Sequence, residues 1–177
     1  EHASKKLQGD KDVVMTAIKE SGPALEYASE EFRADKEVVL KAVNHWAPAL
    51  EYASEELRGD KEVVLTAVKN NGYVLQFANK ELQADKEVVL VAIEADEAAL
   101  QYASEELRDD KEVVLAMVKK GYLIKYFSEK FRADREVVLS AVNKKGTNLK
   151  YASGRLRADR EVVLVAISQN INALEYA

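Results

Sequence analysis

The 177-residue sequence contains no cysteine, only two histidines and only two prolines. Without cysteine there are no disulfides, no thiolate metal ligands and no thiol catalysis, and an intracellular compartment is slightly favoured. Histidine occurs only at His2 and His45, and the sequence has neither a Walker loop nor an H-E-x-x-H motif. We therefore expect a protein that is not an enzyme, with no catalytic residue, no cofactor and no metal site.

Long apolar runs are also missing. The longest are a few residues long and are interrupted by charged residues, so no segment is predicted to span a bilayer or to act as a signal peptide. Because 47% of the residues are hydrophobic, the chain can still bury a continuous core. A soluble protein is the expectation.

One repeated heptad dominates what the sequence does contain. ADKEVVL occupies residues 34–40 and 84–90, and close variants bring the number of copies to seven. Its aspartates lie 25 residues apart, with one interval of 24 near Gly121; they are Asp10, Asp35, Asp60, Asp85, Asp110, Asp134 and Asp159. A fixed period in this range is typical of a solenoid, in which each unit buries its apolar face on its neighbours. We predict a single array of about seven repeats over residues 1–177, starting and ending within a repeat, as a fragment of a longer array would.

Each unit is predicted to begin with a long helix. Val38, Val39, Ala42 and Val43 form an apolar stripe at helical spacing. Asp35 precedes them and can cap the helix by accepting hydrogen bonds from its first N–H groups. A strand is the competing interpretation, because paired valines favour strands, but the alternation that a half-buried strand needs is missing. The pattern therefore favours a helix.

A second, shorter helix should follow a turn. Leu50, Ala53 and Leu57 form the next apolar pattern, and Pro48 lies at its start, where a proline is tolerated. The sequence leaves open whether this helix is continuous, because Ser54 could cap a separate single turn. The predicted fold is all-α: an α-solenoid with a long helix, a short helix and, as a further option, a 3₁₀ turn in each 25-residue repeat.

Several polar and aromatic residues recur at fixed positions. The tyrosines at 27, 52, 102, 126, 151 and 176 are interpreted as core rings, because Phe77 fills the same position once. The arginines at 33, 58, 108, 132 and 157 are interpreted as connectors between layers, with Gln83 in the same position. Both sets of residues are expected to stabilise the packing of repeats rather than to act in catalysis.

Charge is distributed unevenly along the chain. Residues 1–109 hold 13 basic and 23 acidic residues, whereas residues 110–177 hold 13 basic and 8 acidic ones. Lys125 and Lys150 occupy positions that hold Glu26 and Glu51 in earlier units. Such a basic region could meet an acidic protein, a phosphate backbone or an anionic membrane face. Nucleic acid is the weakest of these partners, since the formal net charge is −5.

Variation concentrates in the turn after the long helix, which should form one edge of the array. The residues predicted to form this interaction edge are His45, Trp46, Asn70, Asn71, Tyr73, Lys119, Lys120, Tyr122, Lys144 and Lys145. Aromatic side chains of this kind often anchor interfaces, although their rings could simply pack on the adjacent turn. The predicted function is a noncatalytic scaffold for binding another protein, and the alternative is a structural spacer or a head-to-tail assembly of copies.

The unit D-[KR]-E-V-V-L-x-A-[VI], followed by [AG]-L-[EQ]-Y-A-S-E-E-L-R, resembles a family of short helical repeats known only as a domain of unknown function. The resemblance extends over the whole chain. It implies an α-helical repeat and brings no assigned activity and no catalytic residue. A looser similarity is to leucine-rich variant repeats, which alternate an α-helix with a 3₁₀ helix.

Overall fold

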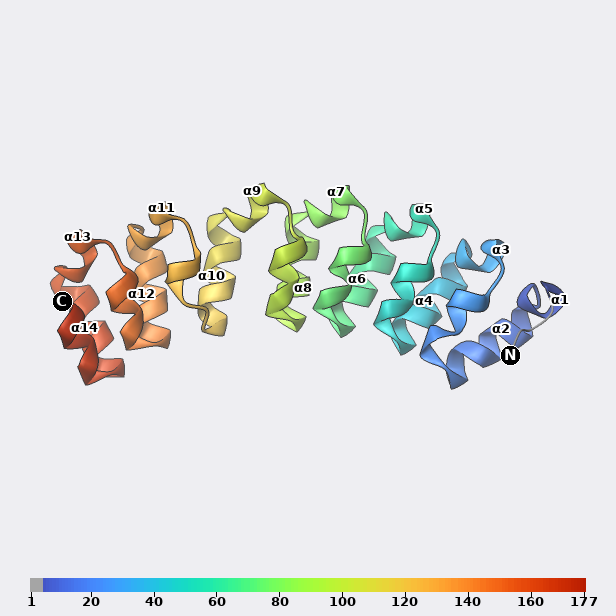
Figure 1. The fold of residues 1–177 in the computed structure, drawn as a ribbon, viewed down its shortest axis with the longest axis horizontal. Helices are drawn as coiled ribbons and strands as arrows, with labels where there is room; N and C mark the ends of the chain where they lie inside the picture. The colour runs from blue at the N-terminus through green and yellow to red at the C-terminus, as the bar shows by residue number, and fades with distance from the viewer. Residues whose placement is uncertain (1–4) are drawn as a thin grey trace. The chain divides into compact units, whose positions relative to one another are not determined.

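A computed structural model describes residues 5–177, and the chain is helical in this range, with no strand (Figure 1). His2 lies outside the described residues. The long α-helices are α2 (Lys11–Glu20), α4 (Lys36–His45), α6 (Lys61–Asn70), α8 (Lys86–Ala95), α10 (Lys111–Lys120), α12 (Arg135–Lys144) and α14 (Arg160–Gln169). The 3₁₀ helices are η1 (Gly22–Tyr27), η2 (Ala47–Tyr52), η3 (Gly72–Phe77), η4 (Glu97–Tyr102), η5 (Ile124–Tyr126), η6 (Gly146–Tyr151) and η7 (Ile171–Tyr176). The short α-helices are α1 (Lys5–Gln8), α3 (Glu30–Arg33), α5 (Glu55–Arg58), α7 (Lys80–Gln83), α9 (Glu105–Arg108), α11 (Glu129–Arg132) and α13 (Gly154–Arg157).

The prediction of an all-α solenoid built from short helical repeats is confirmed. The second helix of each unit is not continuous: a 3₁₀ helix comes first, and a separate four-residue α-helix follows it. In one repeat Ser54 caps the four-residue helix, because its Oγ accepts a hydrogen bond from the N–H of Leu57 at 3.3 Å, whereas Ser29, Ser128 and Ser153 make no such side-chain cap. Each unit therefore consists of a long α-helix, a 3₁₀ helix and one further α-helical turn.

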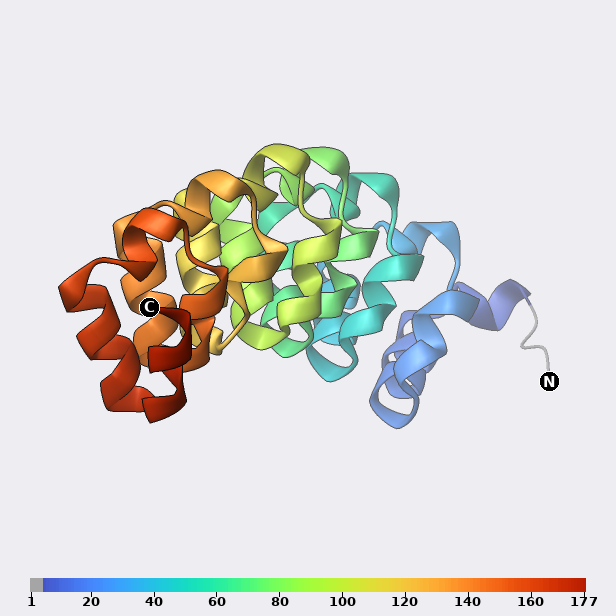
Figure 2. The same cartoon turned by 60° about the vertical axis from the view of Figure 1, so that its left-hand side comes forward.

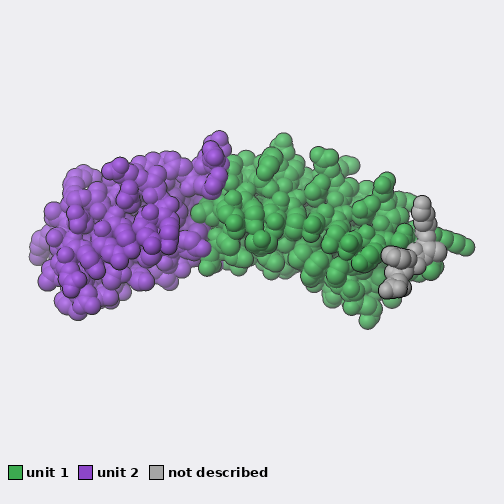
Figure 3. All heavy atoms as spheres, in the orientation of Figure 1, with its two compact units in different colours: residues 1–104 green, residues 105–177 purple. Residues whose placement is uncertain are grey.

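The chain divides into two compact units, residues 1–104 and residues 105–177 (Figure 3). In unit 1, α4, α6 and α8 pack side by side in one layer, and η1 to η4 pack side by side in a second layer against them. In unit 2, α10, α12 and α14 form the first layer and η5, η6 and η7 the second (Figure 2). The predicted single array over residues 1–177 depends on how the two units join, and it stays a prediction.

The apolar stripe of each long helix forms the core. In α4, Val38, Val39, Ala42 and Val43 are fully buried. The equivalent residues of α6, α10 and α12 are buried in the same way; they are Val63, Val64, Ala67 and Val68, Val113, Val114, Met117 and Val118, and Val137, Val138, Ala141 and Val142. Burying one valine contributes about 1.5–3 kcal/mol. Because the stripe faces the neighbouring repeats, this stabilisation depends on stacking.

The capping aspartate also connects successive repeats. In Asp60, Oδ1 accepts hydrogen bonds from the N–H groups of Glu62 at 3.0 Å and Val63 at 3.1 Å, as the sequence predicted. The second oxygen, Oδ2, accepts from Nζ of Lys36 in the preceding repeat at 2.8 Å. The same Nζ lies 2.8 Å from the Glu62 carboxylate. We call this arrangement the charge ladder; its other described members are Lys11 with Asp35 and Glu37, Lys61 with Asp85 and Glu87, Lys111 with Asp134 and Glu136, and Arg135 with Asp159 and Glu161.

The repeat with the 24-residue interval lacks one residue near Gly121, and this deletion changes how its long helix ends. Gly121 follows α10 in the left-handed conformation, with φ of 104°, and is the single residue with positive φ in the described part of the chain. Its N–H donates to the carbonyl of Val118, and the N–H of Tyr122 donates to that of Met117. These two bonds make the glycine-dependent Schellman ending.

The other glycines of this turn are not left-handed. At Gly72, for example, a Cβ atom would lie 2.0 Å from the carbonyl oxygen of Ala92 in the next repeat. Glycine is therefore needed there for close packing between repeats, whereas at Gly121 it is needed for backbone conformation.

Candidate interaction surface

The residues of unit 1 predicted to form the edge follow the long helices α4 and α6. His45 and Asn70 are the last residues of these helices, and both are exposed. Tyr73, in η3, is 44% exposed. Trp46 and Asn71, which follow the two helices, are half-buried. The structure thus places the unit 1 residues of the predicted edge at equivalent turns of successive repeats, with differing access to solvent.

Part of the Trp46 ring packs against neighbouring residues of the array. Its ring stacks on that of Tyr52, with centroids 6.5 Å apart and planes 17° apart. A Cβ atom on Gly22 in the preceding repeat would lie 2.5 Å from Cγ of Trp46. The indole therefore fills space next to Gly22, so part of its surface already serves packing between repeats.

Tyr73 packs on a ring of the next repeat and still presents a surface. Its ring meets that of Tyr102 edge to face, with centroids 5.1 Å apart and planes 87° apart. Burial, the neighbouring Tyr73 and the charge of Asp96 raise the pKa of Tyr102 to about 12. Tyr102 is therefore neutral near pH 7, and the two rings and their hydroxyls are what this part of the edge offers.

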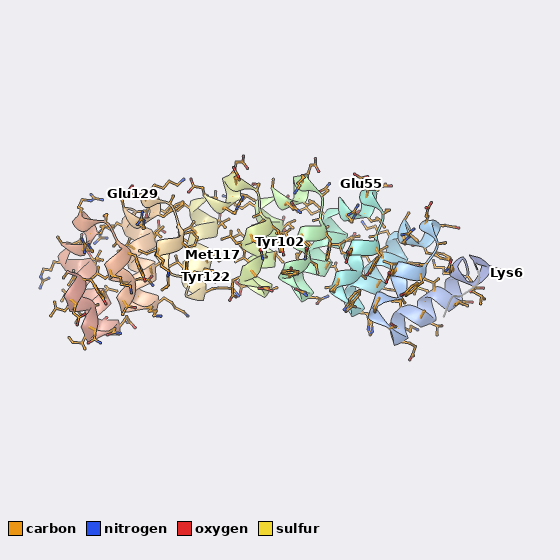
Figure 4. All side chains as sticks on the ribbon, in the orientation of Figure 1. Lys6, Glu55, Tyr102, Met117, Tyr122 and Glu129 are labelled. Atoms are coloured by element: carbon orange, nitrogen blue, oxygen red, sulfur yellow. The ribbon has the colours of Figure 1, made fainter. Side chains whose placement is uncertain are left out.

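The edge residues of unit 2 are mostly basic. Lys119 and Lys120 end α10, and Lys144 and Lys145 occupy the same turn in the next repeat; all four are exposed. Tyr122, half-buried, follows α10 close to Met117 (Figure 4). The structure brings the lysines of unit 2 to equivalent turns of adjacent repeats.

A polar hollow of about 360 Å³ lies in unit 1 where several repeated positions change together. Its lining includes Phe77, Asn79 and Gln83, which replace tyrosine, serine and arginine. Gln83 is buried, and its Nε2 donates to the carbonyls of Leu75 at 3.2 Å and Ala78 at 3.1 Å. The position of the recurring arginines therefore faces the end of the 3₁₀ helix, and the shorter glutamine leaves space there.

The recurring arginines do not form the ion pairs that connect repeats. The Nε atoms of Arg33, Arg58 and Arg132 are buried, with no hydrogen-bond partner in the described structure. The charge ladder makes this connection instead, through the lysine or arginine that follows the capping aspartate. The sequence shows the D-[KR] pair in every repeat. It does not show that the lysine or arginine contacts the aspartate of the next repeat, which depends on how the helices stack.

Neither a metal-binding cluster nor a membrane-spanning helix is found among the described residues. Over residues 5–177, no group of three or more His, Asp or Glu side chains is placed to hold a metal ion. None of the helices in this range is both long enough and apolar enough to cross a membrane. The prominent surface features are the turn edge and the 3₁₀-helix layer.

Stacked short helices, with buried repeated positions and an exposed variable edge, define an α-helical repeat protein of the solenoid class. More specifically, the chain belongs to the family described as a domain of unknown function (DUF4116), whose profile matches residues 1–33, 35–83, 85–132 and 134–177. The two internal matches each span two successive repeats and begin at capping aspartates, Asp35 and Asp85. No curated protein and no solved structure matches the chain.

Proposed function

We propose that the chain is a noncatalytic scaffold that binds another protein through its turn edge. The observation that supports this is the separation of roles between positions. Repeated residues such as Val39 and Val64 are fully buried, whereas variable residues of the turns, such as Asn70 and Lys144, are exposed. Stacking fixes the backbone of each turn. The exposed variable side chains are therefore already in place, and a partner can bind them with little loss of conformational entropy.

The edge also has the chemistry of an interface. Tyr73 supplies an exposed ring whose other face is fixed by Tyr102, and such rings anchor many interfaces. Lys144 and Lys145 add positive charge in unit 2, which speeds encounter with an acidic partner and aids selectivity.

The test compares proteins captured from a cell extract by the wild type, by an edge variant and by a control. The edge variant is Tyr73→Ala with Lys144→Glu. The control, Glu56→Gln with Glu129→Gln, alters exposed residues on short helices α5 and α11. The proposal expects a protein that the wild type and the control retain and the edge variant loses, with saturable binding once that protein is purified. If every captured protein is retained equally by all three folded chains, the proposal is wrong.

A second candidate function is end-to-end stacking onto further repeats, of a longer chain or of a second copy, which would cover the apolar residues exposed in the first and last repeats. Val13 is 41% exposed, whereas Val38, in the same position one repeat later, is fully buried. Ile171 and Leu174 are 67% and 57% exposed, whereas Leu149, the equivalent of Leu174, is fully buried. A second copy stacked end to end would cover these side chains as neighbouring repeats cover theirs.

The charge ladder would extend across such a contact. Asp10 caps α2 through Oδ1, as Asp60 caps α6 through the same atom. Arg160 occupies the ladder position of Lys36 in the last repeat. In a head-to-tail pair, Arg160 of one copy would reach Asp10 of the next.

Light scattering at low salt over a wide range of protein concentration tests this second function. Head-to-tail assembly predicts a mass that rises with concentration and returns to that of the monomer in the Ile171→Lys, Leu174→Lys variant. A monomer throughout the range would remove this candidate.

A further inference from the structure

The 3₁₀-helix layer of unit 2 carries a row of alternating lysines and tyrosines. We call it the Lys–Tyr strip and define it as Lys125, Tyr126, Lys150, Tyr151 and Tyr176. Nζ of Lys125 lies 4.5 Å from the ring centroid of Tyr126 and 5.9 Å from that of Tyr151. Nζ of Lys150 lies 4.7 Å from Tyr151 and 5.9 Å from Tyr176. Each ammonium group is thus placed next to the rings of two successive repeats, which limits its motion.

The charge of the strip is not neutralised within the described part of the chain. The ladder cations Lys111 and Arg135 of the same unit each lie against two carboxylates of the next repeat. Lys125 and Lys150 have no such carboxylate among residues 5–177 and contact aromatic rings instead. The pKa of Tyr151 is lowered by its hydrogen bond with Lys150 and by the nearby charges of Lys125 and Lys145. The strip therefore holds two lysines without an ion pair among the described residues, on the neighbouring helices η5 and η6, and Glu175 occupies the same position in η7.

The strip is a local feature rather than a requirement of the fold. The lysine position holds Glu26 and Glu51 in the first two 3₁₀ helices, Gln76 and Gln101 in the next two, and Glu175 in η7. The stack therefore accepts negative and neutral side chains at this position. The pair of lysines in unit 2 is a departure from the repeat that packing does not explain.

An apolar hollow lies at one end of the strip. It has a volume of about 440 Å³ and is lined by Gly121, Tyr122, Leu123 and Tyr126. Tyr126 is 68% exposed, and its ring is shared between the hollow and Lys125. The hollow occurs where the one-residue deletion shortens η5 to three residues. A ligand on the strip can therefore pair its anionic groups with lysines and place an apolar side chain beside Tyr126.

We propose that the Lys–Tyr strip binds an extended acidic peptide segment, with an apolar side chain seated in the hollow next to Tyr126. This inference rests on the proposed function as a protein-binding scaffold and assigns it a second surface and a partner chemistry. Packed helices lie about 8–10 Å apart. A polyproline II segment returns to the same face every three residues, about 9 Å along its axis. Carboxylates three residues apart would meet Lys125 and Lys150 in turn.

The probe is a synthetic fluorescent peptide with glutamate at every third position and one leucine before the first glutamate. Its affinity is measured by fluorescence polarisation for the full chain and for the Lys125→Glu, Lys150→Glu variant. Glu26 and Glu51 show that the repeat accommodates glutamate there, so the variant should fold. The matched control is Lys19→Glu with Lys69→Glu, exposed residues of unit 1 that give the same change in net charge.

The wild type and the control should bind the peptide, and the strip variant should bind it about tenfold or more weakly. A peptide with the same composition but adjacent glutamates should also bind more weakly. Equal binding by the strip variant, or by the peptide with adjacent glutamates, would overturn the proposal.

Other occupants are separate outcomes of the same set of measurements. Tighter strip-dependent binding of a single-stranded oligonucleotide or of anionic vesicles would overturn the peptide as the ligand. A fall in self-association in the strip variant would identify a second copy as the occupant instead. The strip variant leaves Tyr73 and Lys144 of the turn edge unchanged. If a protein partner is lost by the edge variant and retained by the strip variant, this inference is wrong and the proposed function still stands.

Discussion

The side-chain oxygen of Asn148 accepts a hydrogen bond from the backbone N–H of Ile124 at 3.2 Å. Ile124 is the first residue of the shortened helix η5, so its N–H lacks an acceptor within that helix. Nδ2 of Asn148 donates to the carbonyl of Ala141, also at 3.2 Å, and the amide is almost fully buried. Equivalent positions hold Ala49 and Ala99. The asparagine of one repeat thus satisfies a backbone group that the deletion exposes in the repeat before it.

Replacing Asn148 with alanine should therefore destabilise unit 2, although alanine is the usual residue at this position. The buried N–H of Ile124 would lose its partner, at a cost of about 1–3 kcal/mol, whereas the carbonyl of Ala141 would keep its hydrogen bond from the N–H of Lys145. Urea unfolding of Asn148→Ala against the wild type measures this loss. Asn143→Ala, which alters an exposed asparagine of α12, is the control and should change the free energy of unfolding little. An unchanged unfolding midpoint for Asn148→Ala would contradict the proposed compensation.

Gly121→Ala should destabilise the protein because of backbone conformation alone. The φ of 104° suits glycine, while the nearest atom to an added Cβ is Cε of Lys144 at 3.8 Å, an ordinary contact. The expected cost is about 1–2 kcal/mol, measured as a lower melting temperature. Gly154→Ala is a control for which no loss of stability is expected. No atom lies within 4 Å of the Cβ position of Gly154, and the residue is in helix α13. That control should be neutral or stabilising by up to about 1 kcal/mol. Two variants with the same effect would show that the left-handed conformation is not what matters.

The sequence was sufficient to predict what each repeat determines locally. The role of Asp35 follows from its own helix, since the cap and the apolar stripe are within a few residues of each other. The sequence offered a 3₁₀ turn as an option in each repeat but did not place it at residues 47–52, because the pattern of Leu50 and Ala53 fits a helix of either kind. Ser54 left two interpretations open, and only the structure distinguished them.

Contacts between repeats were harder to predict, because one sequence does not show which residues meet 25 positions apart. Lys36 with Asp60 is a pair of this kind, and so is Asn148 with Ile124. The edge residues could be named from variation alone, but the half-buried state of Trp46 depends on Gly22 in the preceding repeat. Sequence variation thus located the candidate surface without indicating how much of each ring is available.

Phe127 should contribute more to stability than its tyrosine neighbour. It is buried at the end of η5, where the other repeats have alanine, whereas Tyr126 is largely exposed. Phe127→Ala leaves a cavity beside the deletion and should cost roughly 3–5 kcal/mol. Tyr126→Ala should cost much less, and chemical denaturation of both variants makes the comparison. Similar losses for the two would show that Phe127 does not fill the space left by the missing residue.

The charge ladder should confine maximal stability to the pH range between carboxylate and lysine titration. The hydrogen bond from Lys61 lowers the pKa of Asp85, and the hydrogen bonds to Asp85 and Glu87 raise the pKa of Lys61. A lowered carboxyl pKa gives a contribution that is present above the unfolded value of about 3.9 and is lost as the pH falls through the folded value. A raised lysine pKa gives a contribution that is present below about 10.4 and is lost as the pH rises through the folded value.

Lys61→Met removes one cation of the charge ladder, the one that contacts Asp85, and keeps a similar apolar side chain. Without the ammonium group, the pKa of Asp85 should rise toward its ordinary value, which carboxyl NMR titration measures directly. The variant should be less stable than the wild type at neutral pH and should lose less stability on acidification, because an Asp85 with an ordinary pKa no longer contributes to the dependence of stability on pH. Lys69→Met, on the exposed end of the same helix, is the control and should leave the Asp85 titration in place. If the titration of Asp85 is the same in all three proteins, the contact at 2.8 Å between Lys61 and Asp85 does not control the ionisation of the cap.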